Sequence, residues 1–436
     1  MKLMFLAMMA AYVGGNIYIF VRALQQLGGA PTWVRVLFGV LFWAAALALF
    51  VAIGMRNVAL PATLSRAMFN LGSIWLVFTL YMVIALIVTD LAHWVMPSFK
   101  CSFWVALVAV GSLLVYGYWN YRHPRVVELD LAIDRPIEGN EMRIVAVSDV
   151  HLGEGTGREQ LRRYVDMINA QKPDVVLVAG DLIDNSVLPV VRDSMGEELA
   201  RIEAPIYMAA GNHEYISGIE RVEEYLRSTP VRLLRDSVAV LPNGVQLICR
   251  DDRANRRRES LSALIAKADT TRPMVVIDHQ PYHLAEADSL GIDLQISGHT
   301  HHGQVWPLNL LTDRMYEQSH GYRRWSRAHI YVSSGLSLWG PPFRIGTQSE
   351  IVVIRLKNEE RYGRQLLRQK DGGVYGSPRR GHSAPTWALA CALADPKSQP
   401  PRLRSDVYRA RGSTATHYRG QYAHSVGSQS TGSALP

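Results

Sequence analysis

The sequence predicts two parts: a bundle of four membrane-spanning helices, followed by a soluble domain of the α/β class. The first part is predicted by four charge-free apolar stretches of about twenty residues each. The second is predicted by short β-branched runs that alternate with helical stretches from residue 141 onward. Polar clusters rich in aspartate and histidine directly follow several of these runs, which places a candidate site in the second part.

The apolar stretches in residues 1–121 have the length that a helix needs to cross about 30 Å of hydrocarbon. Tryptophan and tyrosine residues near their ends suit the membrane interface. The stretches are Leu3–Val21, Val36–Met55, Ala67–Thr89 and Cys101–Tyr121. A cleaved signal peptide is the alternative for the first stretch, but no clear small-x-small cleavage site follows it and three further stretches do. We therefore predict an integral, multi-pass protein of the plasma membrane.

Four spans place both ends of the bundle on the same side of the membrane. With the N-terminus inside, the cytoplasmic segments would hold five basic residues and the outer segments three. Because cytoplasmic loops are enriched in lysine and arginine, this bias favours a cytoplasmic location for the soluble domain.

The segment 122–140 is interpreted as a linker and 141–357 as the folded domain. Its predicted strands are Arg143–Ser148, Asp174–Val178, Pro205–Met208, Met274–Ile277, Ile292–Ile296, Ile330–Val332 and Ile351–Leu356. Its predicted helices are Arg158–Gln171, Gly218–Ser228 and Glu259–Ala268. Val238–Leu241 and Val245–Arg250, around Pro242-Asn-Gly244, predict a β-hairpin.

Charge is distributed unevenly along the chain. The total is +8, but residues 1–120 carry +5 and residues 361–436 carry +9, which leaves the middle with −6. An acidic middle argues against a nucleic-acid partner. The segment 358–436 is predicted to be a basic, disordered tail, and the abrupt change would also fit a shifted reading frame. The three cysteines have no CxxC spacing, which excludes a thiolate zinc site and a disulfide framework.

Five polar clusters follow predicted strands. They are Asp149-Val-His151, Gly180-Asp-Leu-Ile-Asp184, Gly211-Asn-His-Glu214, Asp278-His-Gln-Pro281 and Gly298-His-Thr-His301. Residues at the carboxyl ends of strands in an α/β sheet converge on one rim, where ligands bind. Seven candidate ligands with carboxylate, imidazole and amide donors suit Mn, Fe or Zn. Seven are too many for one tetrahedral ion and suit two ions that share a carboxylate.

The order of the five clusters resembles the signature of the calcineurin-like metallophosphoesterases, over about Met142–Leu356. Three clusters also resemble the bacterial membrane-associated branch, which typically has glycine where His302 stands. A bulkier side chain there bears on substrate shape and not on metal binding. The resemblance implies a four-layer α-β-β-α sandwich after the transmembrane bundle.

The resemblance also implies a role for each residue. It assigns the first metal to Asp149, His151 and His301. It assigns a bridging role to Asp181 and the second metal to Asn212, His279 and His299. His213 would stabilise the phosphate or protonate the leaving oxygen, and Asp184 and Glu214 would orient ligands.

We therefore expect a phosphoesterase that cleaves phosphodiester or pyrophosphate bonds with a hydroxide bound to two divalent ions. The apolar, aromatic residues between Trp306 and Phe343 would seat acyl chains, lie at the lipid interface or merely pack the sheet. The expected partners are the lipid bilayer and a phosphorylated, lipid-linked substrate, with no nucleic acid and no predicted oligomeric state. One alternative is a phosphodiesterase for soluble cyclic nucleotides or small esters. Another is a non-catalytic membrane sensor with a metal-binding domain.

Overall fold

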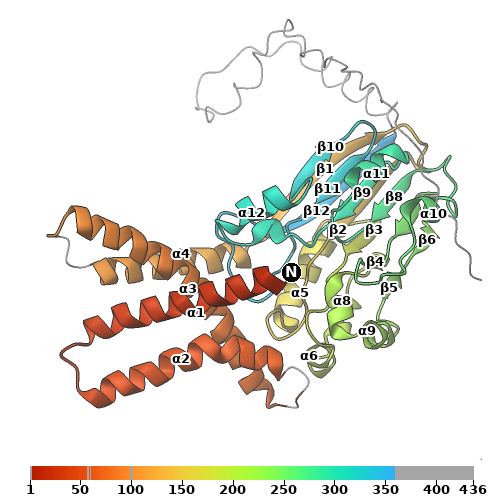
Figure 1. The fold of residues 1–436 in the computed structure, drawn as a ribbon. Coiled ribbons are helices and arrows are strands. Elements are labelled where there is room, and N and C mark those ends of the chain that lie inside the picture. Colours follow the sequence, from red (N-terminus) through yellow and green to blue (C-terminus); the bar gives the residue numbers. More distant parts are fainter. Residues whose placement is uncertain (1, 56–57, 59, 99–101, 359–436) are drawn as a thin grey trace, which may run out of the picture. The chain divides into compact units, whose positions relative to one another are not determined.

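The computed structural model describes residues 2–55, 58, 60–98 and 102–358. Four long helices come first in the chain (Figure 1). They are α1 (Lys2–Gln26), α2 (Thr32–Gly54), α3 (Ala62–Val95) and α4 (Ser102–Arg122). All four are long and apolar enough to cross a membrane. The predicted tail beyond residue 358 and the predicted start of the fourth span at Cys101 lie outside the described residues.

Helix α3 extends at both ends beyond the predicted apolar stretch Ala67–Thr89. The charged residue that flanks the stretch at each end forms an ion pair. It has 34 residues and a length of about 50 Å, which exceeds the 30 Å or so of a hydrocarbon core. Near its start, Arg66 pairs with Asp193 of the soluble domain at 2.7 Å. Near its end, Asp90 pairs with Arg22 at 2.7 Å and accepts a hydrogen bond from Tyr18. The first turns of α3 therefore contact the soluble domain.

The soluble domain contains two six-stranded sheets. The first sheet, in spatial order, consists of β1 (Arg125–Ile133), β12 (Glu350–Asn358), β2 (Glu141–Val147), β3 (Val175–Ala179), β4 (Ile206–Ala209) and β5 (Val231–Leu234). The second consists of β10 (Gly321–Arg324), β11 (His329–Val332), β9 (Leu294–Ser297), β8 (Met274–Ile277), β7 (Gln246–Cys249) and β6 (Ser237–Val240). Strands β2 to β5 run parallel, and so do β7, β8, β9 and β11. The predicted hairpin is present as β6 and β7, which pair antiparallel.

Helices cover the outer faces of both sheets, which confirms the four-layer α-β-β-α class (Figure 1). One core lies between the sheets and contains buried residues from both, such as Leu177 and Val275. A second core joins the first sheet to its helices, which are α5 (Arg158–Ala170), α6 (Leu188–Arg192), α7 (Met195–Leu199) and α9 (Ile219–Leu226). A third joins the second sheet to α10 (Leu261–Ile265) and α11 (Leu284–Ser289). Three short helices, α8 (Asn212–Ser217), η1 (His301–Gly303) and α12 (Leu308–Met315), lie in the connections after β4 and β9.

The interpretation of residues 122–140 as a linker is wrong, because β1 lies within them. Strand β1 pairs in parallel with β12 along its whole length, from Arg125 opposite Glu350 to Ile133 opposite Asn358. Its apolar residues alternate with charged ones, the pattern of a half-buried strand. Its acidic side chains pair with basic ones of β12, with Arg355 contacting Glu128 and Asp130. The domain therefore begins almost directly after the last apolar helix.

Candidate metal centre

The five predicted clusters lie in loops that follow strands of both sheets. Asp149 follows β2, Asp181 follows β3 and Asn212 follows β4 in the first sheet. His279 follows β8, and His299 and His301 follow β9 in the second. Two halves of one site thus come from two sheets that face each other across the central core.

Several of these side chains are aimed by an unusual backbone conformation. The residues Asp149, His151, Asp181, His299 and His301 all have positive φ, between 48° and 70°. A residue with a side chain rarely adopts this region, and such strain is concentrated at functional sites.

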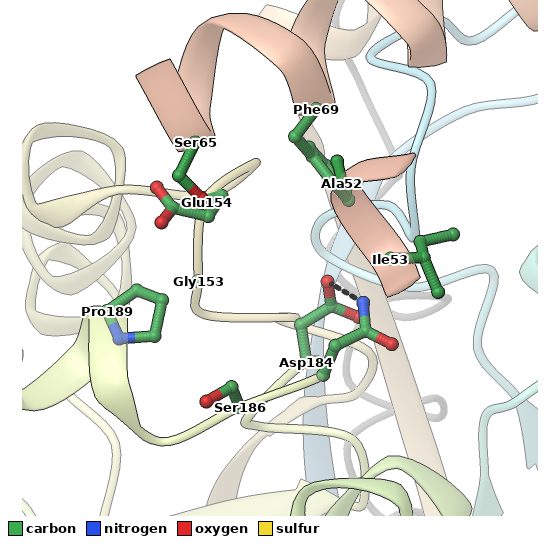
Figure 2. A pocket seen from close by; sticks show the side chains of 10 residues that line it. Ala52, Ile53, Ser65, Phe69, Gly153, Glu154, Asp184, Ser186 and Pro189 are labelled. Carbon is green, nitrogen blue, oxygen red and sulfur yellow. Dashed lines mark hydrogen bonds between the residues drawn. The ribbon is translucent and has the colours of Figure 1, made fainter. Parts of the chain in front are cut away.

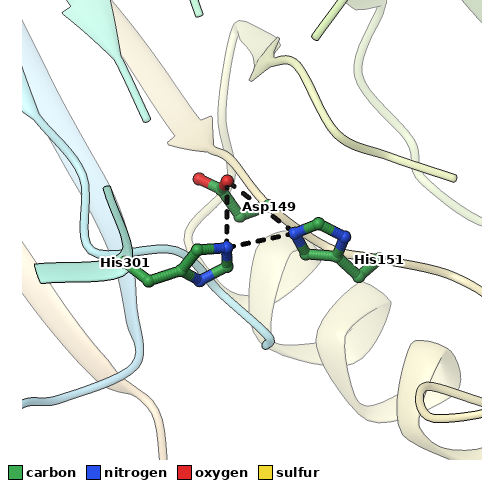
Figure 3. A group of neighbouring side chains, drawn as sticks. All are labelled: Asp149, His151 and His301. Atoms are coloured by element: carbon green, nitrogen blue, oxygen red, sulfur yellow. Dashed lines mark hydrogen bonds and ion pairs between the residues drawn. The ribbon is translucent and has the colours of Figure 1, made fainter. Parts of the chain in front are cut away.

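The first group of converging side chains consists of Asp149, His151 and His301 (Figure 3). The Nε2 atoms of His151 and His301 lie 3.1 Å apart. They lie 3.8 Å and 3.4 Å, respectively, from Oδ1 of Asp149. Both histidine rings and the carboxylate therefore point at the same small volume, as the ligands of one ion do.

The second group consists of Asp181, His279 and His299, with Asn212 beside it. Nε2 of His279 lies 3.1 Å from Oδ2 of Asp181 and 3.2 Å from Oδ1 of Asn212. Nδ1 of His279 lies 2.7 Å from the carbonyl of Ala179 and donates to it, which leaves Nε2 as a donor atom for a metal.

Asp181 joins the two groups. Its Oδ2 atom lies 3.1 Å from His279 and 3.8 Å from His151, and its Oδ1 accepts the backbone N–H of His213 at 2.8 Å. A carboxylate shared in this way offsets the repulsion between two dications. The residues present therefore fit a pair of ions, with Asp181 between them.

Burial keeps two of the imidazoles neutral, which is the form that binds a metal. Burial lowers the pKa of His301 to about 3, against the opposing effect of Asp149. Burial, together with the charge of His279, lowers the pKa of His299 to about 4. At neutral pH both rings present unprotonated nitrogens as ligand atoms.

His213 is in the opposite state, because carboxylates surround it. Burial lowers its pKa, but the charges of Asp181 and Asp184 outweigh this and raise the pKa to about 9. Nδ1 of His213 lies 3.0 Å from Oδ1 of Asp184, and the same oxygen lies 3.3 Å from Nδ1 of His151. Asp184 thus contacts a histidine of the first group and His213 together.

Glu214 holds the backbone of the loops that carry the ligands. It is fully buried, and Oε2 accepts the backbone N–H groups of Asp181 at 3.0 Å and Gly211 at 2.7 Å. Its Oε1 accepts the N–H of Ile183 at 3.0 Å. A carboxylate with three backbone donors fixes the positions of both loops.

Two glycines allow backbone and carboxylate to approach closely. A Cβ on Gly211 would lie 2.2 Å from Oδ1 of Asp181, and a Cβ on Gly298 would lie 2.4 Å from Oδ2 of Asp149. Any side chain at either position would displace a carboxylate of the site.

Arg344 supports the site and was missed by the sequence analysis. Its side chain is fully buried, and burial lowers its pKa to about 10. It donates hydrogen bonds to the carbonyls of His301, Ser334, Gly335 and Ser337. The signal that could have revealed it is a single arginine between apolar residues in the segment 336–345.

Helix α4 also reaches the site, through its last two turns. Asn120 donates to the carbonyls of Arg344 and Thr347. The hydroxyl groups of Tyr121 and Ser337 lie 3.1 Å apart, and the N–H of Ser337 donates to the carbonyl of Asp149. The sequence of α4 predicts a membrane span and does not predict these contacts.

His302, the residue that departs from the family pattern, lies beside the two groups and outside them. Its ring stacks on His320 with centroids 4.6 Å apart, and its Nε2 lies 3.6 Å from Asp313. It therefore lies at the edge of the site.

A small cavity of about 50 Å³ has Asp184 in its wall, the residue whose Oδ1 lies 3.3 Å from Nδ1 of His151 (Figure 2). Gly153, Glu154, Asp184 and neighbouring residues of the soluble domain line one side of it. The other side is lined by four residues near the connection between α2 and α3: Ala52, Ile53, Ser65 and Phe69. Two of the apolar helices thus contribute to the surroundings of the site.

Comparisons with known proteins match the soluble part. The family described as "Calcineurin-like phosphoesterase" matches residues 142–303. An "Uncharacterized metallophosphoesterase" of Helicobacter pylori is 31% identical over 263 residues, which cover 59% of this chain and 70% of that protein. A "Transmembrane protein with metallophosphoesterase domain" of Danio rerio is 34% identical over 273 residues, 58% of this chain and 62% of that protein. A solved dimetal phosphatase from Danio rerio has 13% identity and a TM-score of 0.33, covering 49% of this chain and 98% of that one.

Proposed function

Because this chain belongs to the calcineurin-like metallophosphoesterase family, we propose that it is a membrane-anchored hydrolase of phosphodiester or pyrophosphate bonds. The observation that carries the proposal is the position of Asp181, whose carboxylate lies within 4 Å of a histidine from each of the two groups. This arrangement suits two divalent ions held side by side. The first would be held by Asp149, His151 and His301, and the second by Asn212, His279 and His299.

The side chains have distinct tasks in this proposal. Two bound ions would supply a hydroxide at neutral pH and neutralise charge on the phosphate. His213, whose pKa its carboxylate neighbours raise to about 9, would donate a proton to the leaving oxygen. Asp184 keeps the ring of His213 in position from its Nδ1 side. The nitrogen and oxygen donors favour Mn, Fe or Zn as the ions.

We further propose that the substrate is a phosphorylated, lipid-linked molecule. The cavity beside Asp184 supports this, because residues of α2 and α3 form part of its wall. A substrate whose apolar part lies in the bilayer would meet the site next to these helices. The acidic middle of the sequence makes nucleic acid an unsuitable partner.

The proposed location is the plasma membrane, with α1 to α4 as four spans and the soluble domain on the cytoplasmic side. The small excess of basic residues in the segments on that side supports the orientation. A fusion of alkaline phosphatase after residue 358 tests it in a bacterial host. The fusion is expected to be inactive, whereas an active fusion would place the domain outside.

The function is tested on the full chain, purified in detergent. Metal content is measured by mass spectrometry, and hydrolysis is assayed with Mn²⁺ on a nitrophenyl diester, a nitrophenyl monoester, cyclic AMP and a polyprenyl pyrophosphate. About two ions per chain and turnover of the lipid pyrophosphate are expected. If only the soluble diester or cyclic AMP is hydrolysed and lipid does not compete, the proposal of a lipid-linked substrate is rejected. The proposal of phosphoesterase activity is then retained.

Two variants separate catalysis by this site from contamination. His213→Ala is expected to lower the rate by about 10²–10⁴-fold, the usual contribution of general acid–base catalysis. His283→Asn is the control, because His283 is exposed. Asparagine is the replacement because residue 283 has a positive φ, which asparagine tolerates. Equal rates for His213→Ala and the wild type would mean that the hydrolysis does not come from this site. Bound metal without any turnover would favour a sensor instead.

A further inference from the structure

Helix α12 exposes apolar side chains to an unusual degree for a soluble domain. None of its eight residues is buried. Leu308, Leu310, Leu311 and Met315 are exposed by 43–58%, and Trp306, just before the helix, is exposed by 47%. Contiguous exposed apolar residues of this size indicate a surface that something else covers.

The start of α12 is attached to the apolar helices. The hydroxyl of Tyr81, in α3, donates to the carbonyl of Trp306. Val305 is buried in the same apolar cluster as Val77 and Met82 of α3. The backbone N–H of Trp306 donates to Ile345, a second member of that cluster from the soluble domain. The exposed helix is therefore continuous with the part of the chain that we propose to span the membrane.

The end of α12 reaches the rim of the metal centre. Tyr316, the residue after the helix, has its ring centroid 6.2 Å from that of His299. Asp313 contacts His302 and Ser319, and Glu317 accepts the N–H of His283, so both acidic side chains are bound by the domain itself. Arg314 is exposed among the leucines. The surface is thus apolar, with Asp313, Arg314 and Glu317 exposed toward its end.

We propose that α12 is an interfacial helix whose partner is the lipid bilayer, with its leucines and Trp306 in the headgroup–acyl boundary. Leucine, methionine and tryptophan on a short helix, together with arginine, are the side chains that such helices use. The anchor at Tyr81 selects lipid over a soluble partner, because it joins α12 to a candidate span. The proposal rests on the membrane insertion of α1 to α4 and places the rim of the metal centre at the membrane surface.

Spin labels on the full chain in lipid nanodiscs test the proposal. Single cysteines are introduced at Leu311 in α12, at Val240 in β6 and at Val108 in α4, with Cys101 and Cys391 replaced by serine and the buried Cys249 retained. The controls match in side-chain type: Val240 and Val108 are exposed by 64% and 68%. The accessibility of each label to oxygen and to a water-soluble nickel complex gives its depth.

The label at Leu311 is expected about 5–10 Å below the lipid phosphates, the depth of interfacial helices. The label at Val240 is expected in water and the label at Val108 within the hydrocarbon. If the label at Leu311 is as accessible to nickel as the label at Val240 while the label at Val108 is protected, the proposal of an interfacial helix is rejected. The proposal that α1 to α4 span the membrane is then retained. A short distance between Leu311 labels of two chains would also reject it, in favour of a second copy. A water-exposed Val108 would reject the spans themselves.

Discussion

Asn120, in the last turn of α4, donates its side-chain amide to the backbone carbonyls of Arg344 and Thr347, each at 3.0 Å. Arg344 in turn donates to the carbonyl of His301, at 2.7 Å. One buried amide on an apolar helix therefore positions the loop whose arginine holds a predicted metal ligand. This relationship gives the first prediction.

Asn120→Ala is expected to destabilise the protein by about 1–3 kcal/mol, because two buried carbonyls would lose their donor. It is also expected to weaken metal binding, since the support of His301 would loosen. Thermal unfolding in detergent and metal titration measure the two effects. The control is Asn169→Ala near the end of α5, which also removes two side-chain hydrogen bonds, one donated to the carbonyl of Arg201 and one accepted from the N–H of Glu203. Equal metal affinities of the two variants would contradict the link from α4 to the site.

Glu214→Gln tests the carboxylate that holds two ligand loops together. The amide keeps the size but replaces one acceptor oxygen by an N–H donor, which would face the N–H groups of Asp181, Gly211 or Ile183. Loss of such support typically costs about 10–100-fold in metal affinity. Titration against a chelator of known affinity measures this. Glu220→Gln, at an exposed position in the first turn of α9, is expected to bind metal like the wild type.

Gly298→Ala tests the close approach of backbone and carboxylate. The new Cβ would lie 2.4 Å from Oδ2 of Asp149, so the carboxylate must move away from the first group. A displacement of about 1 Å can lower activity by about 10²-fold. Gly157→Ala is the control, since its Cβ would meet nothing within 4 Å. Wild-type activity of Gly298→Ala would show that Asp149 is not required where it lies.

Because of Glu198, the free energy of unfolding of the domain should vary with pH in the acid range. It is buried and paired with Arg158, Arg162 and Arg201. Hydrogen bonds from these arginines, that of Arg162 first, lower its pKa from 4.5 to about 2. Because the folded pKa is depressed, the stabilisation is complete above pH 4.5 and is lost as the pH falls toward 2.

Glu198→Gln should therefore lower the melting temperature at pH 7, and the difference from wild type should shrink between pH 4.5 and pH 2. Glu197→Gln is the comparison, because this carboxylate is 69% exposed and, within the described part of the chain, pairs only with Arg158, so its loss should cost about 1 kcal/mol or less. Calorimetry or scanning fluorimetry across this pH range gives the result. A difference for Glu198→Gln that stays constant down to pH 2 would contradict the lowered pKa.

The candidate site was predictable because its residues follow strands whose apolar runs are evident. The sequence alone predicts a buried strand at Val175–Ala179, and Asp181 comes directly after the end of this strand. Arg344 could not be predicted in this way, since no strand or motif marks it. Its side chain is satisfied by carbonyls of the loop Ser334–Ser337 and by the carbonyl of His301, more than 40 residues away in the sequence, which only the tertiary structure brings beside it.

The strands at the margins of the sheets were also harder to predict. In β1, charged residues such as Glu128 and Asp130 interrupt the apolar pattern and find partners only on β12, far along the chain. In β10, Tyr322 and Arg323 are exposed, so the sequence has no apolar pattern there that would predict a strand. By contrast, the four apolar helices were evident from composition alone, and only their ends differ from the predicted stretches.

Only His123 and Pro124 lie between the last residue of α4 and the first residue of β1. A connection of two residues is too short to let the soluble domain swing away from α4. In the proposed membrane enzyme, the metal centre would work at a fixed height and in a fixed orientation. A phosphate group would then be cleaved only if its own molecule presents it at that height, which makes the length of the substrate's polar portion a selection criterion.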